Sequence, residues 1–437
     1  MYNPVKFGKI YLFKLSLPIF FSNIALPLVG LIDTGLMGHL GDSKFLAATS
    51  VGATVTTMIL WSFGFFRMGT VGLVSQAFGR GDEKEIIYIL LRNLVLVAFI
   101  SFAIILLKHP ILYLIKLFFI TSNETSILIE KYVLIRLYAA PAELSLYVLT
   151  GLYLGLQKTK ISSLMIFLFC FLNILLSIFF VTIFKLNVSG VALGTLVSAY
   201  ITSIIFFIFT YYFFNKFKIK INFKKLLNKN KFINLFKINF DIFIRTFLLT
   251  FSFLFFIHQS SKLGEDFIAI NNILLQFILL ASFFLDSYAY STEGVIGYTI
   301  GKRSVKSFMK CVKNSFQLSI STGILISILY IFLFKNIVNV LTDIEYLRFL
   351  AYTFVFWVII IPPVASICYQ FDGIFIGASQ TREIRNAMII SVFLFILTSY
   401  FLVDKFANHG LWLSLLFFMI FRSISLNFYF NKILRKF

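Results

Sequence analysis

Long apolar runs, one after another along the whole chain, restrict this sequence more than any other feature does. The 437 residues are 59% hydrophobic and only 13% charged, a balance that soluble domains do not reach. A backbone in lipid must satisfy its own hydrogen bonds, which leaves helices or a closed barrel. Because the runs are continuous rather than short and alternating, we predict an all-α polytopic membrane protein.

The runs predict twelve transmembrane helices. Each run is flanked by polar or charged residues and is long enough to cross the roughly 30 Å hydrocarbon core of a bilayer. We expect these helices at about 12–38, 45–76, 86–107, 127–156, 161–184, 188–214, 236–262, 266–298, 307–334, 347–377, 384–403 and 408–431.

The strong positive charge follows the predicted topology. A formal net charge of +21 could by itself indicate a nucleic-acid partner. Most lysines and arginines, however, lie at the two termini and in alternate loops, above all in the loop 216–235. Positively charged loops stay in the cytoplasm, so we expect both termini and this loop there, with the loop against anionic headgroups. We expect no nucleic-acid partner.

The two halves of the sequence repeat each other. Glycines and prolines recur at an offset of about 222 residues, and such self-similarity indicates duplication. Six helices in each half give both repeats the same orientation in the membrane. The matched pairs include Pro141 with Pro362, Gly151 with Gly373, Gly155 with Gly377 and Gly190 with Gly410.

The repeat sets the predicted domain limits. We expect an N-lobe with helices 1–6 over residues 1–215 and a C-lobe with helices 7–12 over residues 236–437. The polar, basic stretch 216–235 is then a cytoplasmic linker. Because the two lobes already form a complete transport unit, we expect a functional monomer.

One carboxylate stands in the first apolar run. Asp33 is the acid, and a charge inside a span is costly enough that it usually faces the interior of a helix bundle. Pro27 removes a backbone N–H donor six residues earlier and weakens the helix there. An acid in a helix that can bend suits a proton- or cation-coupled transporter. The residues equally allow a structural carboxylate capped by neighbouring polar groups, and a static kink at Pro27.

Three further acids lie in predicted spans of the second half. Asp286 and Glu293 are seven residues apart, which places them on one helix face, and Asp372 begins the string DGIFIGA. They are candidates for a second cation or substrate site, or for structural ion pairs with Arg245 or Lys302. We favour the functional interpretation for Asp286 and Asp372 and the structural one for Glu293.

The environment of Arg245 allows a more specific prediction. This arginine lies near the cytoplasmic start of the seventh helix, four residues after Asp241. Side chains four apart on a helix are neighbours, so we expect Arg245 to pair with Asp241.

Motifs of ATP-driven pumps and of membrane enzymes are absent from the sequence. It contains no phosphate-binding loop, no paired acidic motif for Mg²⁺ and no HExxH zinc motif. The three cysteines are far apart and suggest neither disulfides nor a metal site. We predict a protein that is not an enzyme and needs no cofactor. A membrane-embedded enzyme is kept as the alternative from another class.

Five strings together resemble the multidrug and toxic compound extrusion (MATE) family, and more narrowly its DNA-damage-inducible, DinF-like branch. They cover both halves in the same order and at similar spacing. These strings are SLPIFFSNIALPLVGLIDTGLMGHLG (16–41), FGFFRMGTVGLVSQAFGRGD (63–82), NFDIFIRT (239–246), FLDSYAYSTEGVIGYTIG (284–301) and YQFDGIFIGASQTREIRNAM (369–388).

The resemblance implies a fold and a cation site. It implies two six-helix lobes arranged as a V, with alternating access. Asp33, Asn173 and Thr195 match residues of the family's N-lobe cation or proton site, and Pro27 matches a hinge in its first helix. The family has an aspartate four residues after the asparagine, whereas this chain has Ser177. A serine can ligate a cation but carries no charge, so Asp33 is left as the single acid of this site.

The resemblance also implies a function. We expect a bacterial inner-membrane antiporter that exports small, mainly cationic, organic compounds in exchange for H⁺. Na⁺, held by Asp33, Asn173 and Thr195, is the alternative coupling ion, and no other metal is expected. Membrane lipid and the organic substrate are the expected partners. A lipid or lipid-linked-sugar flippase with the same fold is the alternative function.

Overall fold

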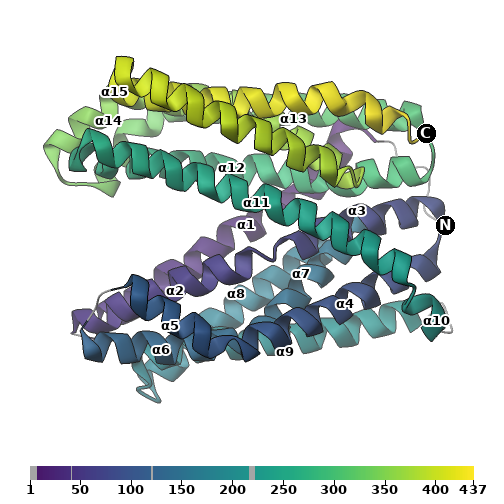
Figure 1. The fold of residues 1–437 in the computed structure, drawn as a ribbon, viewed down its shortest axis with the longest axis horizontal. Coiled ribbons are helices and arrows are strands. Elements are labelled where there is room, and N and C mark those ends of the chain that lie inside the picture. Colours follow the sequence, from purple (N-terminus) through teal and green to yellow (C-terminus); the bar gives the residue numbers. More distant parts are fainter. Residues whose placement is uncertain (1–6, 41, 120–121, 216–221) are drawn as a thin grey trace. The chain divides into compact units, whose positions relative to one another are not determined.

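The computed structural model describes residues 7–40, 42–119, 122–215 and 222–437. Every regular element among them is an α-helix (Figure 1). This is the outcome expected for a backbone that must satisfy its hydrogen bonds within each segment in lipid. The predicted all-helical membrane fold is therefore confirmed. The first six residues of the predicted linker, 216–221, lie outside the described residues.

The first half of the chain contains nine helices among its described residues. Several begin at residues that cap a free backbone N–H group, as Asp42 does for α2 and Asp82 for α4. The helices are α1 (Lys9–Gly38), α2 (Ser43–Trp61), α3 (Phe65–Arg80), α4 (Glu83–Leu106), α5 (Lys108–Phe118), α6 (Asn123–Leu137), α7 (Ala140–Gly155), α8 (Thr159–Thr182) and α9 (Asn187–Asn215).

The second half is built from fewer and longer helices. After the single turn α10 (Phe223–Leu226), each described helix is long enough to cross a bilayer. They are α11 (Lys229–Leu263), α12 (Glu265–Gly301), α13 (Val305–Leu341), α14 (Glu345–Gly377) and α15 (Thr381–Leu434).

By length and hydropathy, the described helices provide up to twelve candidate crossings if α15 is counted as two. Ten continuous or nearly continuous segments, with α2 and α3 joined and α10 joined to α11, are long and apolar enough to cross a membrane. The pair α6 and α7 makes a further span, bent by 47° at its break. α15 divides at Ala407, whose φ of 49° and ψ of −128° are not helical. Each part of α15 is itself long enough to cross the bilayer, which brings the number to twelve.

Breaks and short helices are the main differences from the predicted helices. The predicted helix 45–76 is interrupted between Trp61 and Phe65, and 127–156 between Leu137 and Ala140. α5 and α10 were not expected from the hydropathy, because both are too short for a span. The last two predicted helices, in contrast, are joined as α15 across the Ala407 break.

The chain forms two compact units. One, the N-terminal unit, contains residues 21–77 and 81–237. The other, the C-terminal unit, contains the residues up to Phe20, residues 78–80 and the residues from Ile238 onward. The first part of α1 therefore packs with the C-terminal unit, where the rings of Phe20 and Phe284 stack at 4.0 Å. The predicted lobe limits assign this segment to the N-lobe instead.

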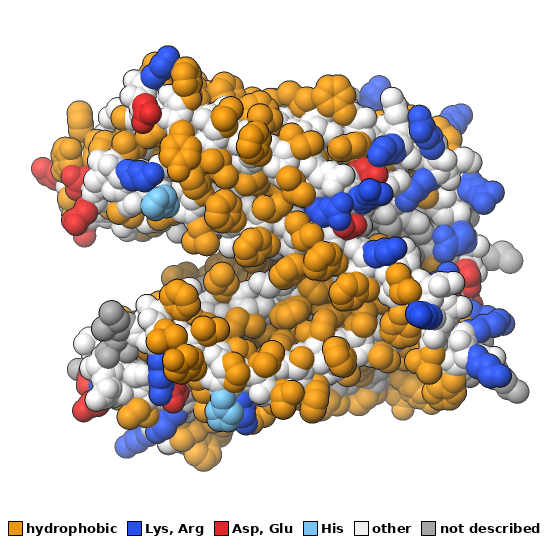
Figure 2. Space-filling view, viewed as in Figure 1, with side chains coloured by type: hydrophobic (Ala, Val, Ile, Leu, Met, Phe, Trp, Pro, Cys, Tyr) orange, Lys and Arg blue, Asp and Glu red, His pale blue; other side chains and the backbone are white. Residues whose placement is uncertain are grey.

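Glycines permit close helix packing in both units. A Cβ atom at Gly151 of α7 would lie 2.5 Å from the Arg67 carbonyl oxygen of α3. A Cβ atom at Gly373 of α14 would lie 2.6 Å from the Ala289 carbonyl oxygen of α12. Small residues let backbones approach in this way in membrane proteins. In the view of Figure 2 the surface of each unit is largely hydrophobic.

Candidate proton and cation site

Asp33 lies in the last three turns of α1. The helix continues unbroken through Pro27. Asp33 is therefore held on one face of a continuous helix. The Asp33 side chain is half-buried, and its Oδ1 atom is buried without a hydrogen-bond partner among the described residues. An unsatisfied buried carboxylate oxygen is unusual. This Asp33 oxygen is available to bind a proton or another ligand.

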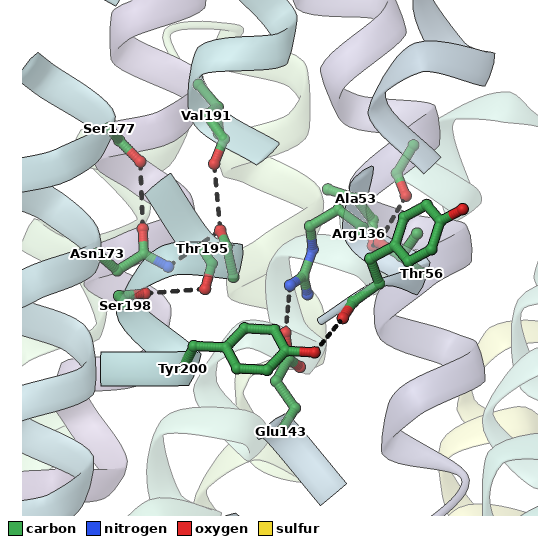
Figure 3. Close-up of polar contacts among 12 residues, drawn as sticks. Ala53, Thr56, Arg136, Glu143, Asn173, Ser177, Val191, Thr195, Ser198 and Tyr200 are labelled. Atoms are coloured by element: carbon green, nitrogen blue, oxygen red, sulfur yellow. Dashed lines mark hydrogen bonds and ion pairs between the residues drawn. The ribbon is translucent and has the colours of Figure 1, made fainter. Parts of the chain in front are cut away.

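A chain of hydrogen bonds joins α8 to α9 in the N-terminal unit (Figure 3). The Ser177 hydroxyl donates to Asn173 Oδ1 at 3.2 Å, and Asn173 Nδ2 donates to the Thr195 hydroxyl at 3.0 Å. The Thr195 hydroxyl in turn lies 3.3 Å from the Val191 carbonyl oxygen, to which it donates. The two helices approach closely here, because Gly194 lies directly against Ser177. The structure thus brings Asn173, Ser177 and Thr195 together.

Asp33 belongs to the same cluster. Its carboxylate interacts with the Ser177 hydroxyl and, electrostatically, with the Arg136 guanidinium. The four residues predicted for the N-lobe site, Asp33, Asn173, Ser177 and Thr195, therefore lie around one position formed by α1, α8 and α9. Their role as a proton or cation site stays a prediction.

A buried ion pair beside this cluster was not predicted from the sequence. Arg136 of α6 donates to the Glu143 carboxylate of α7, and their side chains are only 8% and 12% exposed. Both arise in the broken span between Asn123 and Gly155. The sequence contained one sign of this ion pair, which is a base and an acid seven residues apart inside one apolar run. The break between Leu137 and Ala140 hid their proximity.

The donor set of the cluster limits its chemistry. Asp33 is its one carboxylate apart from the ion-paired Glu143, and the Asn173 and Thr195 oxygens already accept hydrogen bonds from neighbours. Within the described ranges, no three His, Cys, Asp or Glu side chains group closely enough to hold a metal ion. A single carboxylate among neutral hydroxyl and amide groups can still take up and release a proton.

In the C-terminal unit, two arginines share one aspartate. Asp372 Oδ2 accepts from Arg245 and, at 2.6 Å, from Arg422 of α15. All three side chains are at least nine-tenths buried. A structural ion-pair partner for Asp372 was one of the predicted alternatives, but Arg422 was not among the residues considered. Whether Asp372 also serves a cation or substrate site stays a prediction.

The predicted pairing of Arg245 with Asp241 is wrong. Asp241 instead accepts from Arg385 at 2.6 Å and from Thr381 at 3.1 Å. Both partners lie near the beginning of α15. Neighbours on one helix face gain only a few tenths of a kcal/mol from pairing. The buried carboxylate of Asp372 offers Arg245 a stronger interaction in lower dielectric.

Two of the candidate acids, Asp286 and Glu293, lie in α12. Asp286 interacts electrostatically with Tyr369 and with Arg422, and so belongs to the cluster around Asp372. Glu293 is 1% exposed, and its backbone carbonyl lies directly against Gly377 of α14. Whether Asp286 and Glu293 serve a cation or substrate site stays a prediction.

Comparisons with known proteins identify the relatives of this chain. A sequence model described as MatE matches residues 18–179 and 242–401. The DNA damage-inducible protein F of Escherichia coli is 32% identical over 95% of this chain and 90% of its own length. The multidrug export protein MepA of Staphylococcus aureus is 24% identical over 54% of this chain and 52% of its own length.

Solved structures share the fold at low sequence identity. A Vibrio cholerae MATE transporter, VcmN, superposes with a TM-score of 0.85 and 17% identity, over 98% of this chain and 97% of its own. A transporter of the MOP superfamily from Pyrococcus furiosus, described as having a binding pocket of reverse polarity, gives a TM-score of 0.85 and 17% identity, over 98% and 96%. At such identities the likeness shows the fold alone.

Proposed function

The chain belongs to the MATE family of efflux transporters, and we propose that it exports small organic cations in exchange for protons. Members of this family are transporters rather than enzymes. In this proposal, uptake of a proton at Asp33 drives release of the substrate on the other side of the membrane by alternating access. The protein acts as a monomer in the bacterial inner membrane, with both termini in the cytoplasm.

The observation that carries the proposal is the position of Asp33. Its Oδ1 atom is buried and unpartnered among the described residues, within a helix that crosses the membrane. Keeping a carboxylate in a span is costly, and a purely structural acid would be expected to have both oxygens satisfied. A site that gains and loses a proton during transport needs a carboxylate oxygen that is available to bind the proton.

The neighbours of Asp33 favour H⁺ over Na⁺ as the coupling ion. Ser177 contributes no charge where the family pattern has an aspartate, so the cluster attracts a cation less strongly. A Na⁺ ion would also have to displace the hydrogen bonds that join Asn173 to Thr195 and to Ser177. A proton needs only the Asp33 oxygen.

The substrate class follows from charge and from the relatives. MepA is named a multidrug export protein, which supports organic compounds of varied structure as cargo. An acid that is free of a direct ion pair attracts cationic compounds. Asp33 meets this condition better than Asp372, which two arginines already neutralise.

A fluorescent organic cation in reconstituted vesicles tests the proposal. Efflux would be driven in turn by an imposed pH gradient and by an imposed Na⁺ gradient, for the native protein and for Asp33→Asn. We expect efflux driven by the pH gradient, and its loss in the variant. Asp343→Asn is the matched control, since its side chain is fully exposed beside Arg348.

Each other result has a definite meaning. Proton-driven efflux that survives in Asp33→Asn would contradict the assigned site and turn attention to Asp286 and Asp372. Efflux driven by Na⁺ alone would contradict the coupling ion. A native protein without driven efflux of organic cations would favour the flippase alternative, to be tested with labelled lipids.

A further inference from the structure

The short helix α10, in the linker between the two repeats, is docked on α4 within the N-terminal unit (Figure 1). The Arg92 guanidinium of α4 donates to the backbone carbonyls of Lys225 at 2.8 Å and of Leu226 at 3.1 Å. The backbone N–H of Asn222 donates to the Tyr88 hydroxyl at 3.1 Å. Because Arg92 is only 4% exposed, these bonds hold α10 at one position on α4.

The same arginine also fixes the beginning of α11. Glu85 of α4 pairs with Arg92 at 3.1 Å and with Lys231 of α11 at 3.2 Å. Burying a guanidinium is costly unless its donors are satisfied, and here two carbonyl oxygens and one carboxylate satisfy them. A segment that only joined the two repeats would not need such a fixed position. The docking of α10 therefore indicates a further role.

α10 contacts α4 at the level of a membrane interface. The apolar run of α4 begins at Ile86, and the contacts are made by Tyr88 and Arg92, inside that run. At 1.5 Å per residue, Tyr88 lies roughly 8 Å along the helix axis from Glu83, where α4 begins. The headgroup layer on each side of a bilayer is about 5–8 Å thick. This level corresponds to the headgroups rather than to bulk water.

The side chains that α10 and the next residue expose suit such an interface. Leu226 is the buried residue of the turn, whereas Phe223 and Leu227 are 73% and 62% exposed. Lys224 and Lys225 stand between them, and both are exposed. Apolar side chains beside lysines are typical of segments that lie in the headgroup region, where the lysine stems cover apolar surface and the ammonium groups stay in water.

The charge around α10 favours an anionic partner. Residues 82–92 and 222–231 together carry six basic and three acidic side chains. One of the three acids, Glu85, already pairs with two of the basic groups. An excess of lysine at the level of the headgroups attracts anionic lipids over zwitterionic ones.

We propose that α10 binds an anionic phospholipid of the adjacent leaflet. Lys224 and Lys225 contact the lipid phosphate, and Phe223 and Leu227 lie at the boundary of the acyl chains. The charge of the loop 216–235 alone predicts only a general attraction to headgroups, whereas here the contact is limited to four side chains. This role is independent of the transported substrate and of the coupling ion.

A fluorescent probe on this segment tests the inference. Leu227→Cys, made after the three buried cysteines are replaced by alanine, is labelled with an apolar dye. The protein is reconstituted into vesicles of phosphatidylcholine and phosphatidylglycerol. A small fraction of either lipid carries a spin label, which quenches a dye in contact with it. We expect spin-labelled phosphatidylglycerol to quench at least about twofold more than spin-labelled phosphatidylcholine. The difference should shrink at high salt.

Two double variants separate the proposed contact from a general effect of charge. Lys224→Gln/Lys225→Gln, in the labelled protein, should remove the preference, so that the two spin-labelled lipids quench equally. Both lysines are exposed, so this variant should fold. Lys131→Gln/Lys335→Gln removes the same charge from exposed positions in α6 and α13 and should retain the preference.

Four results would overturn the inference. They are equal quenching by the two lipids in the labelled protein, a preference that persists in Lys224→Gln/Lys225→Gln, its equal loss in Lys131→Gln/Lys335→Gln, and quenching by aqueous iodide but by neither lipid. None of these measurements depends on transport. Failure of the proposed function would appear separately, as proton-driven efflux that survives in Asp33→Asn.

Discussion

The guanidinium of Arg422 lies 2.6 Å from the carboxylate of Asp372, although the two residues come from different helices 50 positions apart. Arg245 binds the same carboxylate oxygen. The cluster is almost fully buried, so its members depend on one another more than a surface pair would. This relationship makes the stability of the C-terminal unit sensitive to a single acid.

We expect Asp372→Asn to lower the free energy of unfolding by about 3–5 kcal/mol, because two buried guanidinium groups lose their anionic partner. The measurement is the thermal unfolding midpoint of the detergent-purified protein. Asp343→Asn is the control, since that exposed pair with Arg348 should contribute at most about 1 kcal/mol. An Asp372→Asn protein of native stability that no longer transports would instead support a direct role in cation or substrate binding.

Ser177→Asp should change the coupling of the transporter. It places a second carboxylate next to Asp33, and two nearby carboxylates attract a cation more strongly than one does. We expect a Na⁺ gradient to drive efflux faster in this variant than in the native protein, measured in reconstituted vesicles. Ser177→Asn adds similar bulk without charge and serves as the control. Equal Na⁺ responses in the two variants would show that charge at this position does not select the ion.

Pro27→Ala tests whether the first helix bends during transport. α1 is already helical through Pro27, and alanine restores the missing N–H donor, so the variant should be at least as stable as the native protein. If Pro27 is a hinge, efflux should be several-fold slower at that unchanged stability. Pro18→Ala, in the same helix, is the matched control. Native efflux rates in both variants would identify Pro27 as a static kink.

Gly373→Ala should disturb the contact between α14 and α12. Its Cβ atom would lie 2.6 Å from the Ala289 carbonyl oxygen, and forcing the helices apart should cost about 1–3 kcal/mol of stability. The unfolding midpoint reports the effect. Gly30→Ala is the control, because a Cβ atom there meets nothing within 4 Å. Equal midpoints for the two variants would mean that α14 can shift without loss.

The helical fold, most of the spans and the family could be predicted from the sequence. Each span satisfies its backbone locally, so hydropathy alone is enough to locate a helix such as α8 or α13. Glycines such as Gly373 also indicated the duplication through their repeat. The interruption between α6 and α7 was missed, because the residues around it are as apolar as a continuous span. A proline at the start of α7 was the one local sign of a break.

The sequence by itself determined that Asp33, Asn173, Ser177 and Thr195 are the residues to examine, because their types and spacing match a family motif. Only the tertiary structure decided which charges meet. Arg245 pairs with Asp372, 127 residues away, rather than with Asp241 on its own helix. Arg136 of α6 pairs with Glu143 of α7 across the 47° bend. A buried charge pairs with the opposite charge that helix packing brings close to it in a medium of low dielectric. The sequence of a single helix does not determine which other helices pack against it.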